Sequence, residues 1–408
     1  MLKGLFDFRG QTLQIRWSII NTAIIFIFLG LISLSSTSDL SQFDATFYKQ
    51  FVWFFLGSFA FVIVQYVRLQ FMYDYGYIFY IILIFLIGIT AFAPIIEGSR
   101  RWIVLGSIYF QPSEFGKILY ISSMARFFSD NRSKGKLSFY FFMILFFSLL
   151  RPLLIIRQPD LGTAISYLAV ILPLIFWTRT KVYLVFFLIS PIFSIFATYQ
   201  LWVYYLWMFL FLLVLLISRP KLYIAVLNLI LNISCAISAP YIWNNFLREH
   251  QKERILTFLN PLVDPLGSGY QVIQSMISIG SGGFLGKGLG NGTQTHLKFL
   301  PVRDSDFIIS VLAEEHGFKA IFLIILSISI FIYWCLVYAK KIENRYVSAL
   351  VVGCCSIIYM HMIINMGMIS GLLPVTGLPA PFISYGGSFF LTCSIVVGLI
   401  NNAINNHI

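Results

Sequence analysis

The feature that most limits what this chain can fold into is the recurrence of apolar runs of about 20 residues. As a helix, a run of that length crosses the hydrocarbon core of a bilayer. With 59% hydrophobic and only 11% charged residues, a chain of 408 residues has too little polar surface for a soluble domain. The sequence therefore predicts an all-α polytopic integral membrane protein, folded as a single membrane domain over residues 1–408.

About twelve such runs can be placed along the chain. They lie near residues 17–35, 51–67, 72–92, 112–128, 139–156, 161–177, 182–199, 202–218, 222–240, 307–337, 347–369 and 389–404. We therefore expect N-terminal helices over 17–240, a large loop over 241–305 and C-terminal helices over 306–408. The first run lacks a small-residue cleavage site, so it is expected to stay as an anchor.

Lysine and arginine fall in every second loop between these runs, the pattern of loops that stay in the cytoplasm. Both termini are therefore expected in the cytoplasm. The loops of the other parity are expected on the outer side, at residues 36–50, 94–111, 157–160, 241–305 and 371–388. The net charge of +12 then follows from topology, and it does not indicate nucleic-acid binding.

Cysteine and histidine indicate neither disulfides nor a metal site. The five cysteines all lie inside apolar runs, where a thiol behaves as a small hydrophobic group. The five histidines show no spacing typical of metal ligands.

Three groups of charged residues near the expected outer face are candidates for binding an anionic or polar ligand. Arg100 and Arg101 form a basic pair suited to an anion, or they extend to lipid headgroups. Glu114 and Lys117 share a helix face at the start of the fourth span, where they line a polar cavity or form a structural ion pair. Asp160 is a site residue, a cap of the sixth helix, or both.

The most polar stretch of the chain runs from Arg254 to Phe318 and contains Asp264. Pro261 and Pro265 restrict the backbone around this carboxylate, and nearby glycines allow sharp turns. Asp264 could thus be held in a fixed orientation, as a general base requires. The same residues also make an ordinary turn sequence.

The glycine run from Gly280 to Gly290 does not fit a phosphate-binding P-loop. Ser281 stands where the first glycine of that motif belongs, and Gly288 replaces the required Ser or Thr. Exposed N–H groups together with Lys287 could still form an anion-binding nest, or the run is only a flexible loop.

The segment 371–388 is apolar but is interrupted by three prolines and several glycines, so it cannot be a regular spanning helix. Irregular backbone at membrane depth is tolerated only where it is buried in protein or lines a cavity. We therefore expect a re-entrant loop packed beside the outward site.

Taken in order, these motifs resemble those of the SEDS family of cell-wall polymerases. They are RRWIVLG with QPSEFGK, RQPDLGTA, NPLVDPLGSGYQ, GSGGFLGKGLGNGTQT with KFLPVRDSDFIISVLAEEHG, and LLPVTGLPAPFISYGGS. The resemblance covers the chain from about residue 94 onward. It is closer to the elongation-type RodA branch than to the division-type FtsW branch, chiefly in GLLPVTGLP and GTQTHLKFLP.

The resemblance implies a peptidoglycan glycosyltransferase that polymerises lipid II on the outer face of the bacterial cytoplasmic membrane during cell elongation and rod-shape maintenance. The essential aspartate of the family maps onto Asp264, as general base for the acceptor hydroxyl. Expected substrate-binding residues are Arg100, Arg101, Gln111, Glu114, Lys117, Asp160, Lys287 and Ser384. Cationic members of this set are expected to stabilise the leaving pyrophosphate. No cofactor is implied with certainty, and the need for a divalent cation, Mg²⁺ or Mn²⁺, is left open.

The implied partners are lipid II, the nascent glycan, a class B penicillin-binding transpeptidase, and elongation-complex proteins such as MreC and MreD. Two other functions stay open, namely a lipid II flippase and a noncatalytic scaffold for the transpeptidase.

The chain departs from the family in its surplus of spans, because members usually have about ten. We attribute the surplus to an inserted hairpin at 182–218, which preserves the outward placement of Asp264. Phe389 stands where a second serine is common, a departure that changes little.

Overall fold

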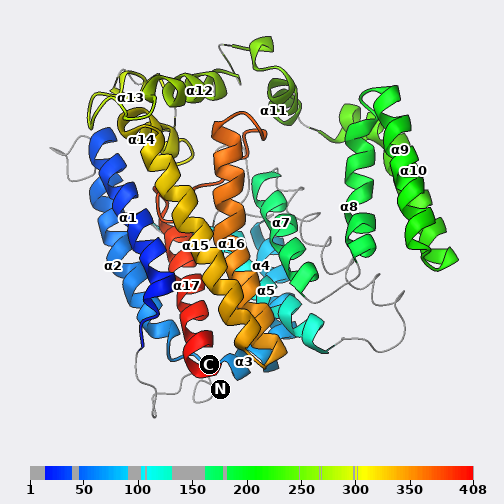
Figure 1. Cartoon of the computed structure of the whole chain (residues 1–408), viewed down its shortest axis with the longest axis horizontal. Helices are drawn as coiled ribbons and strands as arrows, with labels where there is room; N and C mark the ends of the chain where they lie inside the picture. The colour runs from blue at the N-terminus through cyan, green and yellow to red at the C-terminus, as the bar shows by residue number, and fades with distance from the viewer. Residues whose placement is uncertain are drawn as a thin grey trace.

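The computed structural model shows a bundle of helices that lie side by side with most axes along one direction (Figure 1). The structure describes residues 14–38, 46–90, 103–105, 108–130, 161–177, 182–247, 249–265, 267, 269–296, 299–300 and 302–407. The predicted span at 139–156 lies outside these residues, as do the predicted site residues Arg100, Arg101 and Asp160.

Five helices come from the first third of the chain. They are α1 (Trp17–Thr37), α2 (Thr46–Val64), α3 (Leu69–Asp74), α4 (Gly76–Thr90) and α5 (Pro112–Asp130). Proline suits the first position of α5 because its fixed φ fits a helix and its missing N–H is not needed there. A small antiparallel hairpin precedes α5, with β1 (Ile103–Leu105) paired to β2 (Ile108–Phe110). The helical class is confirmed, and this hairpin is an addition that the apolar pattern did not predict.

Four helices follow, and the last three pack as a group at the edge of the bundle (Figure 1). They are α7 (Leu161–Trp177), α8 (Val182–Ala197), α9 (Leu201–Ser218) and α10 (Leu222–Tyr241). Inside the group, the side chain of Asn232 donates to Ser190 at 2.9 Å and accepts from Ser194 at 2.6 Å. Such hydrogen bonds hold helices together in a membrane. The predicted hairpin at 182–218 corresponds to α8 and α9, and its status as an insertion stays a prediction.

Short helices cap the end of the bundle opposite to the two chain termini (Figure 1). They are the π-helix η2 (Ile242–Phe246), α11 (Glu249–Leu259), the 3-10 helix η3 (Pro261–Val263), α12 (Tyr270–Gly282), α13 (Thr293–His296) and α14 (Ile308–His316). Of these, α12 packs against α14. The predicted loop at 241–305 is therefore rich in short helices rather than irregular throughout.

The centre of the fold is built by the last helices. They are α15 (Phe318–Lys341), α16 (Arg345–Ile369) and α17 (Gly387–His407). Of the most apolar 18-residue stretch in each helix, 83% is buried in α16 and 78% in α17, against 6% in α9. α16 packs against α5, α7, α15 and α17, and α17 also packs against α2. The C-terminal helices thus form the core, whereas α9 lies at the periphery.

The predicted single span at 307–337 is wrong, because the chain breaks there into α14 and α15. Gly317, between the two helices, has a φ of 69°, a conformation that glycine adopts at little cost. A Cβ at this position would meet the backbone of Phe284 and Gly286. The first residues of α14 are apolar like those of α15, so the apolar pattern continues across the break, which falls just after Glu314, Glu315 and His316.

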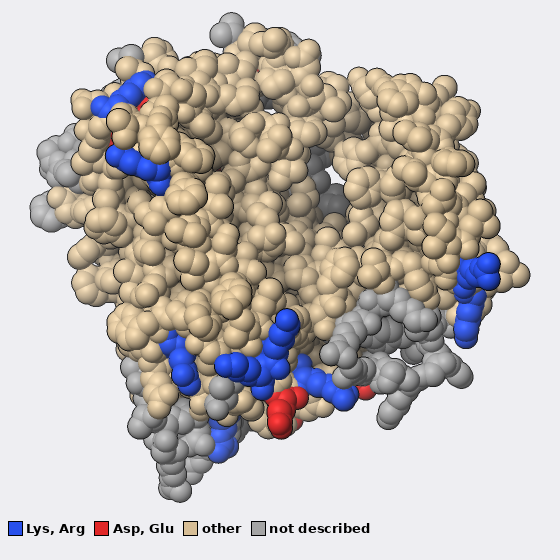
Figure 2. Space-filling model, viewed as in Figure 1, with Lys and Arg blue, Asp and Glu red and all other residues tan. Residues whose placement is uncertain are grey.

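Among the described residues, seven helices are long and apolar enough to cross a membrane, and three shorter apolar helices accompany them. On the face seen in Figure 2, the visible charged side chains gather toward the upper and lower ends, and a band between them shows none. This distribution fits a hydrocarbon core around the middle of the bundle. The chain is a multi-pass membrane protein, as its composition predicted.

Candidate active site

Asp264 lies in the turn between η3 and α12, among the short helices at the end opposite to the termini (Figure 1). The turn is fixed from both sides. The side chain of Asn260 accepts the N–H of Leu262 at 3.1 Å, which caps η3. The carbonyl of Asp264 accepts the N–H of Gly269 at 3.0 Å, and its Oδ1 accepts the N–H of Gly267 at 2.9 Å. The carboxylate is therefore oriented while its side chain stays partly exposed, the geometry that a general base requires.

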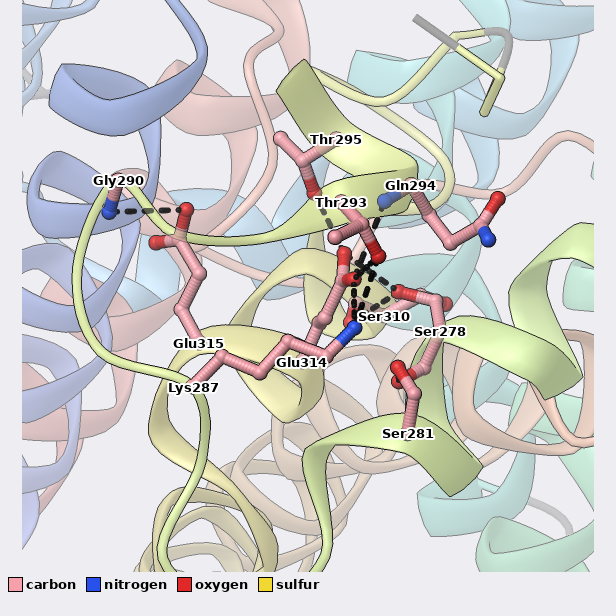
Figure 3. A network of polar contacts seen from close by, with 10 residues as sticks. All are labelled: Ser278, Ser281, Lys287, Gly290, Thr293, Gln294, Thr295, Ser310, Glu314 and Glu315. Atoms are coloured by element: carbon pink, nitrogen blue, oxygen red, sulfur yellow. Dashed lines mark hydrogen bonds and ion pairs between the residues drawn. The ribbon is translucent and has the colours of Figure 1, made fainter. Parts of the chain in front are cut away.

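The glycine-rich loop that follows α12 closes over a second carboxylate, that of Glu314 on α14 (Figure 3). The Glu314 side chain is fully buried. Its oxygens accept hydrogen bonds from Lys287 Nζ at 2.7 Å, from the Gln294 N–H and the Thr293 and Thr295 hydroxyls at 3.1 Å each, and from the Ser278 hydroxyl at 3.3 Å. A buried carboxylate is tolerated when its charge is paired and its lone pairs are used in this way.

The donors around Glu314 control its ionisation. Burial alone would raise the pKa of Glu314, but the hydrogen bond from Lys287 and those from residues 293–295 outweigh it and lower the pKa below its ordinary value. Glu314 is therefore ionised at neutral pH, and its negative charge compensates the positive charge of Lys287.

This arrangement changes the interpretation of Lys287. The sequence suggested an anion-binding nest formed by N–H groups of the glycine run and Lys287. In the structure, Lys287 pairs with the chain's own Glu314, and among the described residues no N–H group of the glycine run donates to that carboxylate. Lys287 also donates to the hydroxyl of Thr293 at 2.9 Å. A pyrophosphate would have to compete with a carboxylate at 2.7 Å for this ammonium group. The geometry thus favours a structural role for Lys287, that of holding the loop on α14.

The neighbouring Glu315 fastens the same loop at a second point. Its Oε1 accepts the hydroxyl of Ser36 on α1 and the N–H of Gly290 at 3.3 Å. The Glu315 carbonyl accepts the N–H of Gly288 at 2.9 Å. Gly286 has a φ of 83°, and a Cβ there would meet the Glu315 backbone. Glycine is therefore required for the close approach of loop and helix.

Ser384 lies in the irregular segment 371–386 and is buried. Its hydroxyl donates to the carbonyl of Ser305 at 2.6 Å and accepts a backbone N–H of its own segment at 2.8 Å. Asn365 of α16 donates to one carbonyl in each of two segments, 302–306 and 371–386, at 2.8 Å. These bonds tie the two irregular segments together, so the observed role of Ser384 is to position backbone.

Glu114 and Lys117 face each other, as predicted, but inside the bundle. Lys117 Nζ lies 2.8 Å from both Glu114 oxygens and 2.9 Å from Nε2 of His361 on α16. Only 4% of Glu114 and 1% of Lys117 is exposed, and His361 is fully buried. An ammonium group only donates, so Nε2 accepts and the imidazole is neutral. This burial favours a structural ion pair over one that lines an open cavity.

The predicted substrate-binding residue Gln111 is also buried, and its carbonyl accepts the Glu114 N–H at 3.1 Å.

Sequence reasoning missed the roles of Glu314 and His361. Two adjacent acids before a long apolar run are a usable signal for Glu314, because ionisable groups beside a membrane need a partner. His361 is 244 positions away from Lys117, so no local spacing could connect them.

Comparison with known proteins places this geometry in a family. The model of the FtsW/RodA/SpoVE family, described as cell cycle protein, matches residues 14–206 and 201–407. The two matched stretches meet inside the predicted hairpin at 182–218. Together they contain every element described above.

Two curated relatives and one solved structure agree with this match. Peptidoglycan glycosyltransferase MrdB of Escherichia coli (strain K12) is 32% identical over 325 residues, 79% of this chain and 76% of the relative. Peptidoglycan glycosyltransferase RodA of Treponema pallidum (strain Nichols) is 30% identical over 434 residues, 98% of each chain. A chain in a solved peptidoglycan synthase complex shares the fold, with a TM-score of 0.71, 24% identity, and coverage of 97% of this chain and 99% of that chain. Since the family model spans nearly the whole chain and both relatives align over most of it, this chain belongs to the FtsW/RodA/SpoVE family, which confirms the resemblance carried by its motifs.

Proposed function

We propose that this chain is a peptidoglycan glycosyltransferase that polymerises lipid II into glycan strands during cell elongation and rod-shape maintenance. Its relatives MrdB and RodA carry the name of that activity, which supports the proposal. The single observation that carries it is the Asp264 carboxylate, which is partly exposed and oriented by its turn at the end of the bundle opposite to the termini.

In the proposed reaction, Asp264 acts as the general base. It takes the proton of the acceptor 4-hydroxyl as that oxygen attacks the anomeric carbon of the donor sugar. The bond between the anomeric carbon and the pyrophosphate oxygen breaks, and undecaprenyl pyrophosphate leaves with the electron pair. The hydrogen bond from the Gly267 N–H holds the Asp264 carboxylate in its orientation, so the base is positioned before the substrate arrives.

The leaving pyrophosphate needs positive charge, and we assign this role to Arg100 and Arg101 rather than to Lys287. The ion pair of Lys287 with Glu314 supports this choice. Among the described residues, no group of three or more His, Cys, Asp and Glu side chains is placed to hold a metal ion, so no step is assigned to Mg²⁺ or Mn²⁺. Gln111, Ser384 and Asp160 are assigned supporting roles, in which they position the segments around the substrate.

We place both termini in the cytoplasm of a bacterium and Asp264 on the outer side of the inner membrane. The alternation of basic loops supports this orientation, as does the location of the two termini at one end and of α11 to α14 at the other (Figure 1). A class B penicillin-binding transpeptidase is the proposed partner, with MreC and MreD in the same assembly. The fold shared with a chain of a peptidoglycan synthase complex is consistent with such a partner.

The test is to reconstitute the purified chain with its cognate transpeptidase in liposomes that contain lipid II. We expect glycan strands and release of undecaprenyl pyrophosphate. Transfer of lipid II between leaflets without polymerisation would identify a flippase instead. A stable complex with neither activity would identify a scaffold, and either result would contradict the proposal.

Substitution of Gly267 by alanine is expected to lower polymerisation at least tenfold without unfolding the protein. A Cβ at this position would meet the Asp264 carboxylate, and that side chain is what would have to move. The measurement is the rate of glycan formation at equal thermal stability. Gly280→Ala is the matched control, because a Cβ there has open space and alanine favours the helix. Equal activity of the two variants would show that the orientation of Asp264 is unimportant.

A further inference from the structure

A cavity of about 530 Å³ opens beside the first turn of α2, on other elements than the Asp264 turn. Its described lining residues are Thr46, Leu300, Val302, Arg303, Asp304, Ser305 and Tyr385. In Figure 1, α2 lies at the left edge of the bundle, whereas α11, which leads to Asp264, lies right of centre. The volume falls within the range of about 300 to 1,000 Å³ that is usual for small-molecule sites.

The two charged residues in the lining compensate each other. Nε of Arg303 lies 3.9 Å from Oδ1 of Asp304. The guanidinium group also donates to the backbone carbonyl of Thr37 at 3.0 Å and to that of Thr295. Two of its five N–H donors are thus engaged by backbone carbonyls, and Asp304 compensates its charge. A cavity of this kind is poorly suited to a pyrophosphate or a free cation, and better suited to an uncharged polar ligand.

Asp304 keeps capacity to accept further hydrogen bonds. An ionised carboxylate offers about four lone-pair sites. The hydroxyl of Thr46 donates to Oδ2 at a long distance of 3.3 Å, and within the described part of the chain Oδ1 makes no hydrogen bond. The side chain is 31% exposed. Oδ1 is itself buried, so a hydroxyl group of a ligand would reach the carboxylate at Oδ2, beside the long hydrogen bond from Thr46.

Tyr385 adds an aromatic ring and a neutral hydroxyl to the same cavity. Burial raises the pKa of its phenol above the ordinary value, with the charge of Lys49 acting to lower it and that of Asp304 acting to raise it. The phenol therefore stays protonated and is able to donate a hydrogen bond. Its backbone N–H donates to the Asp304 carbonyl at 2.9 Å. This hydrogen bond links the segment that carries Tyr385 to the segment that carries Asp304.

Val302 provides an independent sign of function at this place. Its φ is 52°, a region in which a β-branched residue is strained, and its side chain is 53% exposed. Neither burial nor packing explains why a valine stands there. Backbone strain of this kind clusters at ligand-binding sites, where the surrounding structure holds it in place.

We propose that this cavity is a saccharide subsite, which holds an uncharged, hydroxyl-rich sugar unit of the glycan strand away from the reacting centre. The inference rests on the proposed function and deepens it, because a strand held at a second point stays bound between successive additions. Asp304 and Thr46 would bind sugar hydroxyls, Tyr385 would bind a sugar face, and Leu300 and Val302 would supply the apolar walls.

The test uses the full-length chain in detergent and the tetramer of N-acetylglucosamine as a neutral, lipid-free probe. We expect calorimetric binding to the wild type, and binding at least about tenfold weaker to Asp304→Asn and to Thr46→Val. In polymerisation assays, the same variants are expected to make shorter strands than the wild type and the control variant. Asp74→Asn is the matched control, because Asp74 lies on α3, away from this cavity.

Each other outcome has a distinct meaning. Polymerisation by a wild type that does not bind the probe, or equal binding by all variants, would overturn the subsite and leave the proposed function standing. Probe binding without any polymerisation would overturn the proposed function, and with it the role of the subsite in strand retention. Displacement of the probe by phosphatidylglycerol in bicelles would show that the cavity takes a lipid headgroup, which would also overturn the proposal.

Discussion

Replacing Asp264 by asparagine is expected to reduce the rate of lipid II polymerisation by about 10² to 10⁴-fold, the usual contribution of a general base. The amide has almost the same size and can still accept the Gly267 N–H, so the turn between η3 and α12 should keep its shape. What is lost is the ability to take the proton of the attacking hydroxyl. The measurement is strand formation by the purified complex under single-turnover conditions.

The control for this variant is Glu253→Gln, which removes one exposed carboxylate from α11 in the same outward loop. It changes the net charge equally and should keep wild-type activity. Both variants should unfold at the wild-type temperature and should co-purify with the transpeptidase. Full activity of Asp264→Asn would contradict the general-base assignment and would return the flippase and scaffold functions to consideration.

The membrane fold was predictable because it depends on the length of apolar runs, and hydrocarbon thickness fixes that length. The predicted start of α5 at Pro112 is confirmed, since proline has a defined preference at that position. The boundary between α14 and α15 was not predictable in the same way. It depends on contact of Gly317 with the backbone of Phe284 and Gly286, which are distant in the sequence.

The candidate site was predictable to a different degree at each residue. Local pattern is enough to place Asp264 in a turn and to pair Glu114 with Lys117, because both interactions span three positions. The partner of Lys287 could not be inferred, since Glu314 is 27 positions away and shares no helix with it. Binding of an external anion by Lys287 and the glycine run stays a prediction, and the structure adds an internal carboxylate beside Lys287 that the sequence pattern did not indicate.

Replacing Glu314 by glutamine is expected to release the glycine-rich loop from α14. The amide accepts fewer and weaker hydrogen bonds, and Lys287 loses the carboxylate at 2.7 Å that compensates its charge. Breaking a buried pair costs about 3 kcal/mol, which raises the population of the open loop by about 10²-fold. Since Lys287 is 25% exposed, part of its charge can be solvated, and this limits the effect. Trypsin cleavage after Lys287 measures the opening, because a protease cuts the open form.

The matched control is Glu343→Gln, which changes an exposed carboxylate between α15 and α16 and should leave cleavage unchanged. The double variant Lys287→Met/Glu314→Gln should be more stable than Glu314→Gln alone, because it leaves no uncompensated ammonium group. Wild-type resistance to trypsin in Glu314→Gln would show that the pair does not hold the loop.

The pH dependence of stability tests the same carboxylate independently. Because the folded state lowers the pKa of Glu314 from its ordinary value of 4.5, the unfolded state binds the proton more tightly. The contribution of Glu314 is therefore complete above about pH 4.5 and is lost as the pH falls through the lower folded pKa. The thermal unfolding midpoint of the wild type should drop in that window by more than that of Glu314→Gln, which has no proton to bind at this position. Parallel curves for the two proteins would show that the hydrogen bonds around Glu314 do not stabilise its ionised form.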